Sequence, residues 1–325
     1  MNKKIIWISL ITLSVLLILG YLTVWLYTQR NLIAQFPQMD KLPIIKRRSI
    51  QIIAITIGAV LIAVSSLSFQ TITDNKILTP SVLGFDAIYI ITQTLLVALL
   101  GANSLFFANE YINFILSTIL MIGIVLMMYQ FILRKNKNNV VLLLLVGLII
   151  STLASNISNF IQVFMDPENF QSITAMTTVS LNNIKENLVL ISIPIMILTI
   201  FLFAKEQRYY DVMILGENQA IGLGVDFHKK TKHTLIYIAI AVSVSTALIG
   251  PLSFLGLIAV SSAREIFKTN KHRILMIASS LLSLVFILIG QLIVELLDHQ
   301  TSVSVMISLI GGTYMIYLIL KENKI

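Results

Sequence analysis

Apolar residues occur in long runs along this chain, and short polar segments separate the runs. Each run is about 20 residues long, the length that an α-helix needs to cross the hydrocarbon core of a bilayer. The pattern predicts about ten transmembrane helices, with both chain ends on one side because the number is even. The predicted spans are 5–27, 50–70, 84–101, 112–133, 140–164, 187–204, 233–249, 252–266, 274–297 and 303–320.

The first run follows Lys3 and Lys4 and has the outline of a signal peptide. It is longer than the roughly 7–15 apolar residues of a signal-peptide core, and no A-x-A cleavage site follows it. We therefore expect an uncleaved first span. The loops between spans are too short for a second domain, so residues 1–325 are predicted to form a single all-α, polytopic transmembrane domain.

Composition supports a membrane protein. Hydrophobic residues make up 57% of the chain and charged residues only 12%, with a mean hydropathy of +0.91. Soluble domains carry about 25% charged residues, so this chain cannot cover a water-facing surface of its size. A soluble enzyme, a disordered chain and a fibrous repeat are excluded. The chain has no cysteine and four scattered histidines, so we expect no disulfide, no metal site and no cofactor.

Lysine and arginine counts indicate the orientation, because cytoplasmic loops are enriched in these residues. With the N-terminus inside, 17 of the 23 fall on the cytoplasmic side. Both termini are therefore predicted to be cytoplasmic in a cell-membrane protein. The six predicted outside are Arg30, Lys41, Lys46, Arg47, Arg48 and Lys185.

The predicted outer loop 28–49 carries five of those six cations against one acid, Asp40. Two interpretations are open at this point. The cations could lie among lipid headgroups, or the topology could be wrong. Alternatively they form a basic docking patch for an acidic partner outside the cell membrane.

No catalytic motif is present in the sequence. It has no G-x-x-x-x-G-K-[ST] phosphate loop, so the chain is not expected to hydrolyse ATP itself, and it has no acid-rich D-D-x-x-D run. Asp86, Glu110 and Glu295 fall near span ends, whereas ion-coupled carriers place ionisable residues near the membrane centre. We predict a transport protein that is not an enzyme.

The fifth predicted span carries a stripe of uncharged polar residues on one helix face. Burying these amides and hydroxyls against lipid would be unfavourable, so they must face other helices or water. They could hydrogen-bond between helices. The length of the stripe favours a second interpretation, the wall of a translocation path for a polar solute. The candidate path residues are Ser151, Ser155, Asn156, Asn159 and Gln162, with Ser158 and Thr152 beside them.

The longest predicted cytoplasmic loop is 205–232. Within it, L-G-E-N-Q-A-I-G-L-G at 215–224 predicts a short helix that ends at Gly224, since glycine is a common helix stop. A second cytoplasmic turn, A-R-E-I-F-K-T-N at 263–270, follows the short eighth span.

Five segments in order resemble the FecCD/BtuC-type permease subunits of ATP-driven importers for ferric siderophores and cobalamin, from about residue 41 to 320. N-K-I-L-T-P-S-V-L-G at 75–84 resembles the family's N-P-L-A-x-P-x-L-L-G, and M-D-P-E at 165–168 its A-D-P-E. Residues 215–225 resemble L-G-E-x-A-x-x-L-G-V. G-P-L-S-F-L-G-L-I at 250–258 resembles G-P-I-G-F-V-G-L-I, and L-I-G-G at 309–312 resembles L/I-I-G-A-P.

The resemblance implies a ten-span subunit that dimerises around a central path, the type II ABC importer fold. It implies that a cytoplasmic ATPase dimer contacts Glu217, Ala220 and Gly224. It also implies that an external or periplasmic binding (lipo)protein docks on the basic residues before the second span. The family's L-R-L-P-R there resembles I-I-K-R-R at 44–48, which assigns docking to Lys46, Arg47 and Arg48, with Lys46 and Arg48 at the two basic positions.

Two departures concern the partners. The family often reads P-H-I-A-R where V-S-S-A-R occupies 260–264, and a further basic docking residue is usual where Glu295 stands. This asymmetry would suit a heterodimer, in which a sister subunit supplies what this one lacks, and the second permease subunit can be an identical copy or a paralogue. The resemblance implies import of a ferric siderophore, with a catecholate as one candidate. Three alternatives are a cobalamin or haem permease, an ion-coupled secondary carrier, and a membrane-embedded enzyme.

Overall fold

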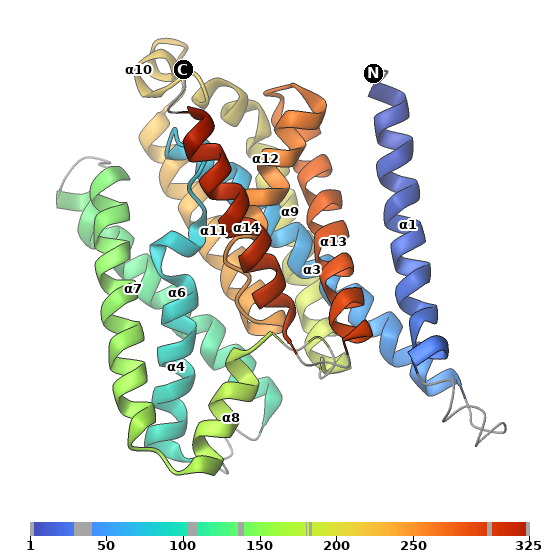
Figure 1. The fold of residues 1–325 in the computed structure, drawn as a ribbon. Helices are drawn as coiled ribbons and strands as arrows, with labels where there is room; N and C mark the ends of the chain where they lie inside the picture. Colours follow the sequence, from blue (N-terminus) through green and yellow to red (C-terminus); the bar gives the residue numbers. More distant parts are fainter. Residues whose placement is uncertain are drawn as a thin grey trace.

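The computed structural model describes residues 3–28, 41–102, 104, 109–135, 140–179, 181, 184–297 and 301–322, and this part of the chain is built from helices (Figure 1). The main helices are α1 (Lys3–Thr28), α3 (Leu42–Ile72), α4 (Phe85–Leu100), α6 (Glu110–Lys135), α7 (Val140–Val163), α9 (Glu186–Met213), α11 (Phe227–Ile249), α12 (Leu255–Phe267), α13 (His272–Leu296) and α14 (Val303–Glu322). The short ones are η1 (Pro80–Leu83), α8 (Pro167–Thr177) and α10 (Glu217–Gly222).

Each of the predicted spans coincides with one main helix, which confirms the all-α class. Seven helices in the described ranges are long and apolar enough to cross a membrane: α1, α3, α6, α7, α9, α11 and α13. The apolar helix α4 and the Val303–Tyr317 part of α14 are shorter, and α12 has 13 residues. The prediction of about ten membrane-spanning helices is therefore approximately correct.

Several helices extend beyond the predicted spans. Helix α3 begins at Leu42, with Pro43 in its first turn, so Lys46 to Arg48 are helical rather than in a loop. Helix α9 continues to Met213, which shortens the loop predicted for 205–232. Lysine, arginine and glutamate favour helix, so a helix can continue past its apolar segment. Residues 29–40, including Arg30 and Asp40, lie outside the described residues.

Helix α3 forms the centre of the bundle and packs against α9, α11, α12 and α13. Two glycines allow this packing. A Cβ atom at Gly58 would clash with Ile249 of α11, and one at Gly256 of α12 would clash with Ser66 of α3. Small residues let transmembrane helices approach at backbone distance, where van der Waals contacts drive association.

Helices α4, α7 and α8 form a second group beside the central one, and α6 connects the two groups because it packs on both α11 and α4 (Figure 1). The backbone of α7 lies against η1, because a Cβ atom at Gly147 would be 2.9 Å from the Cα of Leu83. Helix α1 stands at the opposite edge and packs mainly on α13.

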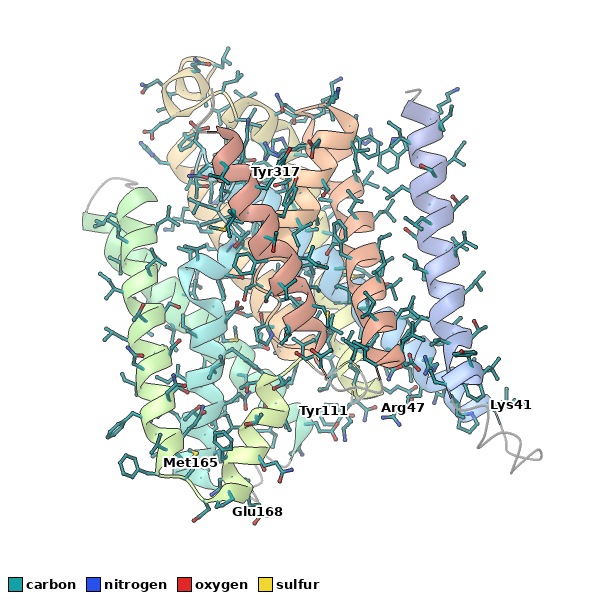
Figure 2. The ribbon with its side chains drawn as sticks, in the orientation of Figure 1. Lys41, Arg47, Tyr111, Met165, Glu168 and Tyr317 are labelled. Carbon is teal, nitrogen blue, oxygen red and sulfur yellow. The ribbon has the colours of Figure 1, made fainter. Side chains whose placement is uncertain are left out.

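The two ends of the bundle carry different segments. The start of α1, the end of α14 and the short helix α10 lie at one end (Figure 1). Lys41, Arg47 and Glu168 lie at the other end, and Tyr317 lies towards the first (Figure 2). We call these the α10 end and the Arg47 end. The even number of spans predicts this arrangement of the chain ends.

Candidate functional site

The three basic residues assigned to docking occupy the first two turns of α3. The Lys46 ammonium lies 2.9 Å from a carboxylate oxygen of Glu186, and both side chains are exposed. Arg47 is also exposed at this end of the bundle (Figure 2). Lys46 and Arg47 are therefore accessible to a partner, and their docking role stays a prediction.

Arg48, in contrast, is turned into the bundle. Its guanidinium donates two hydrogen bonds to the carboxylate of Glu295 on α13, one of them 3.1 Å long. A third, 2.7 Å long, goes to the backbone carbonyl of Tyr21 on α1, and the guanidinium lies 4.9 Å from the centre of the Tyr21 ring. The Arg48 and Glu295 side chains are only 12% and 6% exposed. Arg48 thus ties α1, α3 and α13 together, a role that sequence spacing over 247 residues could not indicate.

The three acids near span ends all have partners. Asp86, in the first turn of α4, accepts a 2.6 Å hydrogen bond from the Ser253 hydroxyl. Glu110 lies 2.6 Å from the Lys185 ammonium, and Glu295 pairs with Arg48 as described. These contacts tie helices together, which leaves none of the three as an unpartnered site for a coupling ion.

Two residues of the polar stripe on α7, Ser158 and Gln162, form a hydrogen-bond cluster with α4. The hydroxyls of Ser158 and Thr94 of α4 lie 2.6 Å apart. The Gln162 amide donates to Thr94 at 2.9 Å and to Ser158 at 3.2 Å. Ser151 packs against Gly84, where an added Cβ atom would lie 3.1 Å from the Ser151 Cβ. This side of α7 holds the second helix group together.

Other residues of the stripe lie towards the outside of the single chain. Ser155 is half-buried, while Asn156 and Asn159 are exposed on the surface of the single chain. Large apolar side chains surround them, including Ile157 and Phe160. Lipid cannot satisfy an amide, so these two side chains need water or another protein surface beside them. The path assignment of these residues stays a prediction, and the structure divides the stripe into a bonded and an exposed side.

Helix α10 is a short helix of six residues between α9 and α11. It begins after Gly216 and is closed by Gly224, whose φ is +83°. The Val225 amide donates to the Ala220 carbonyl at 3.0 Å, and the Gly224 amide to the Ile221 carbonyl at 2.9 Å. These two bonds form a Schellman motif, which requires a left-handed residue such as glycine. The sequence predicted this stop correctly.

The exposed surface of α10 and its flanking residues is mixed, with three large apolar side chains beside polar Glu217, Asn218 and Gln219. Ala220 is buried against the rest of the chain, whereas Leu215, Ile221 and Leu223 are exposed. Glu217 is also exposed, and its carboxylate lies 3.6 Å from the His228 ring. Exposed apolar side chains gathered on a rigid turn are typical of a protein contact surface. The family resemblance pointed to Glu217, Ala220 and Gly224 and gave no indication of the three exposed apolar residues.

His272 fixes the end of α9 close to α10. This histidine is fully buried at the start of α13. Its backbone amide donates to the Asp211 carboxylate at 2.7 Å, and its Nδ1 lies 2.8 Å from the same oxygen. Its Nε2 lies 2.7 Å from the Thr71 hydroxyl of α3. Helices α3, α9 and α13 are thus connected directly before α10, by contacts that no local sequence pattern indicates.

A family model described as the FecCD transport family matches residues 6–321. The chain is 42% identical over 279 residues to the petrobactin import system permease protein YclO of Bacillus subtilis (strain 168), covering 86% of this chain and 89% of that protein. It is 32% identical over 320 residues to the petrobactin import system permease protein FatC of Bacillus anthracis, covering 98% and 90%.

The fold also matches a solved structure. That structure is described as an inward-facing conformation of a metal-chelate type ABC transporter. The TM-score is 0.82 at 21% sequence identity, and the match covers 98% of this chain and all of the other. At this identity the likeness shows the fold.

Proposed function

The chain belongs to the FecCD transport family of ABC importer permeases, and from this premise we propose that it carries a ferric siderophore across the cell membrane into the cytoplasm. As a permease it is a multi-pass membrane protein and a transport subunit, not an enzyme, and an ATPase and a substrate-binding protein act with it. The observation that carries the siderophore assignment is that both relatives described above are petrobactin import permeases.

We assign the α10 end to the cytoplasm, with both termini on that side. The excess of lysine and arginine in the segments at this end supports the orientation. The Arg47 end then faces outward. The substrate enters there, after delivery by the binding protein.

The surface of α10 contacts one subunit of a cytoplasmic ABC ATPase dimer. Exposed Leu215, Ile221 and Leu223 supply apolar contact area, and Glu217 stands beside them. The Schellman closure at Gly224 keeps the turn rigid, so that movement of the ATPase would be transmitted to α9 and α11 rather than absorbed in the loop.

Lys46 and Arg47 form the docking patch for acidic side chains of the binding protein. Both are exposed at the outer end, and charge complementarity at such a rim speeds association. Arg48 supports this patch indirectly, because its contacts to Glu295 and Tyr21 fix the first turns of α3.

A second permease subunit completes the path. Asn156 and Asn159 on the exposed side of α7 would line it together with the facing subunit, and Ser155 extends the same face. The departures at Glu295 and at 260–264 support a heterodimer of unlike permeases, and membrane lipid covers the remaining apolar surface.

Transport by the reconstituted complex tests the proposal. Proteoliposomes that hold this chain, its ATPase and a second permease should take up iron-labelled ferric petrobactin when binding protein and ATP are present. A ferric catecholate, a ferric hydroxamate, cobalamin and haem serve as competing substrates. Preferential uptake of cobalamin or haem would overturn the siderophore assignment. Uptake that survives ATP depletion and stops with an uncoupler would indicate a secondary carrier.

A further inference from the structure

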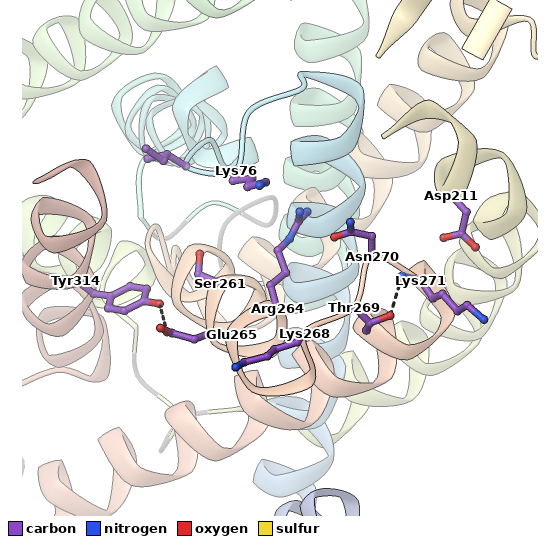
Figure 3. Close-up of a pocket in the computed structure, with 11 residues that line it drawn as sticks. Lys76, Asp211, Ser261, Arg264, Glu265, Lys268, Thr269, Asn270, Lys271 and Tyr314 are labelled. Atoms are coloured by element: carbon purple, nitrogen blue, oxygen red, sulfur yellow. Dashed lines mark hydrogen bonds between the residues drawn. The ribbon is translucent and has the colours of Figure 1, made fainter. Parts of the chain in front are cut away.

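A cavity of about 850 Å³ opens at the α10 end of the bundle (Figure 3). The loop after α3, the end of α9, the α12–α13 turn and α14 form its walls. None of the sites described above includes it. Its charged lining residues are Lys76, Asp211, Arg264, Glu265, Lys268 and Lys271.

The charge in this cavity is unbalanced. The lining includes four cations and two acids, and both acids already have partners. The Asp211 carboxylate is held by His272, and the Glu265 carboxylate lies 3.4 Å from the Tyr314 hydroxyl that donates to it. Within the described ranges, none of the four cations forms an ion pair.

Among the described residues, Arg264 is the cation in this cavity whose side chain most clearly lacks a partner. Its side chain points from α12 towards Lys76, which comes from the loop after α3 (Figure 3). The Nε of Arg264 is buried and has no hydrogen-bond partner in the part of the chain that the structure describes. Two like charges that face each other repel, and a partly buried guanidinium without an acceptor is unfavourable. An anion between the two side chains would remove both penalties.

We propose that this cavity binds a phosphate group, held between Arg264 and Lys76. The guanidinium offers several donors in a fixed plane, a geometry that suits phosphate oxygens, and the lysine adds a flexible positive charge. Ser261 and Asn270 line the same cavity and offer a hydroxyl and an amide as further donors. The phosphate group can come from a soluble phosphate compound or from the headgroup of an anionic lipid.

The α12–α13 turn connects the proposed site to the end of α9. Lys271 lines the cavity, and the next residue, His272, holds Asp211 near the end of α9. Asp211 lies six residues before Glu217, where α10 begins. A bound phosphate group would therefore act on the segment that leads into α10.

Binding measurements on the full-length chain in detergent test the proposal. Pyrophosphate and inorganic phosphate are titrated by calorimetry at constant ionic strength, and retention of phosphatidylglycerol against phosphatidylcholine is measured by native mass spectrometry. The variants are Arg264→Gln and Lys76→Gln. Lys232→Gln is the matched control, because Lys232 is an exposed lysine near the same end, on α11.

We expect the wild-type chain and Lys232→Gln to bind equally and the two cavity variants to bind about tenfold more weakly, the loss expected for one charge-assisted contact. Binding of pyrophosphate alone identifies a soluble ligand, and retention of phosphatidylglycerol alone identifies a lipid headgroup. Equal binding by all four proteins overturns the proposal, as does the absence of any binding. Lys76 lies in a loop, so Lys76→Gln keeps the test valid if Arg264→Gln fails to fold.

Discussion

Cations at the two ends of the bundle are arranged differently. At the Arg47 end, three basic side chains contact carboxylates and thereby connect helices. In the cavity at the α10 end, the described basic side chains contact no carboxylate. We infer that the buried pair Arg48–Glu295 holds helices together, whereas the cavity cations, which have no ion pair among the described residues, are left to bind an anion. The pairs at the Arg47 end are Lys46–Glu186, Arg48–Glu295 and Lys185–Glu110.

The Arg48–Glu295 pair should give the largest stability effect. Glu295→Ala leaves the nearly buried Arg48 without its carboxylate, and loss of one partner of a buried pair costs about 3–5 kcal/mol. The free energy of unfolding, measured in detergent with increasing denaturant, should fall by this order.

Glu186→Ala is the matched control for Glu295→Ala. It removes the partner of exposed Lys46, and exposed pairs contribute about 0–1 kcal/mol. Equal losses in the two variants would contradict the view that the inward pair holds α1 and α13 on α3.

At the α10 end, Gly224→Pro should weaken binding of the ATPase while the rest of the bundle stays folded. Proline removes the amide that bonds to Ile221, and its φ of about −65° is incompatible with +83°. Co-purification of the ATPase and ATP-dependent uptake should both fall at least about tenfold, the effect of roughly 1.4 kcal/mol.

Gly222→Ala serves as the control for Gly224→Pro. Gly222 lies within α10, and a Cβ atom there meets no other atom within 4 Å. Normal co-purification of the ATPase with the Gly224→Pro protein would remove α10 from the coupling assignment.

The two sides of α7 extend the comparison to uncharged groups. Thr94→Val removes the hydroxyl that contacts Ser158 and Gln162. The free energy of unfolding should therefore fall by about 1 kcal/mol. Asn159→Leu alters an exposed side chain, so stability should stay constant while the uptake rate falls. A change in stability alone for Asn159→Leu would show that the exposed side does not line the path.

Charge reversal at the docking patch should give the smallest effect. In the Lys46→Glu/Arg47→Glu double variant, affinity for the binding protein should fall several-fold at low salt, because exposed charges interact weakly and are screened within about 10 Å at 0.1 M salt. The affinity difference from wild type should shrink as salt rises. An unchanged Kd at low salt would exclude a docking role for both residues.

The helices were predictable because each one must supply a continuous apolar segment to the bilayer, and that demand is local in sequence. The closure of α10 by Gly224 was predictable for a similar reason. A single glycine supplies the left-handed backbone conformation that closes a helix, so the signal is also local in sequence. Helix α8 was not predicted, because its 11 residues fall short of the roughly 20 apolar residues that define a span.

The contacts between distant residues could not be predicted. Arg48 was assigned to docking on its position before the second span, whereas its pairing with Glu295 depends on how α3 and α13 pack. The polar stripe on α7 is a second case in which the sequence could not predict which residues form contacts. Periodicity places Ser158 and Asn159 on one broad face, but only the position of α4 makes the first a hydrogen-bonding residue and leaves the second exposed.

The glycine contacts of α3 restrict how the molecule can deform during transport. At Gly58 the backbone of α3 touches the Ile249 side chain of α11, and at Gly256 the backbone of α12 touches the Ser66 side chain of α3, so these helices cannot slide past one another without separating. Gly147 fixes α7 to η1 in the same way. A movement that the subunit makes during transport must therefore carry α3, α11 and α12 together, and η1 together with α7.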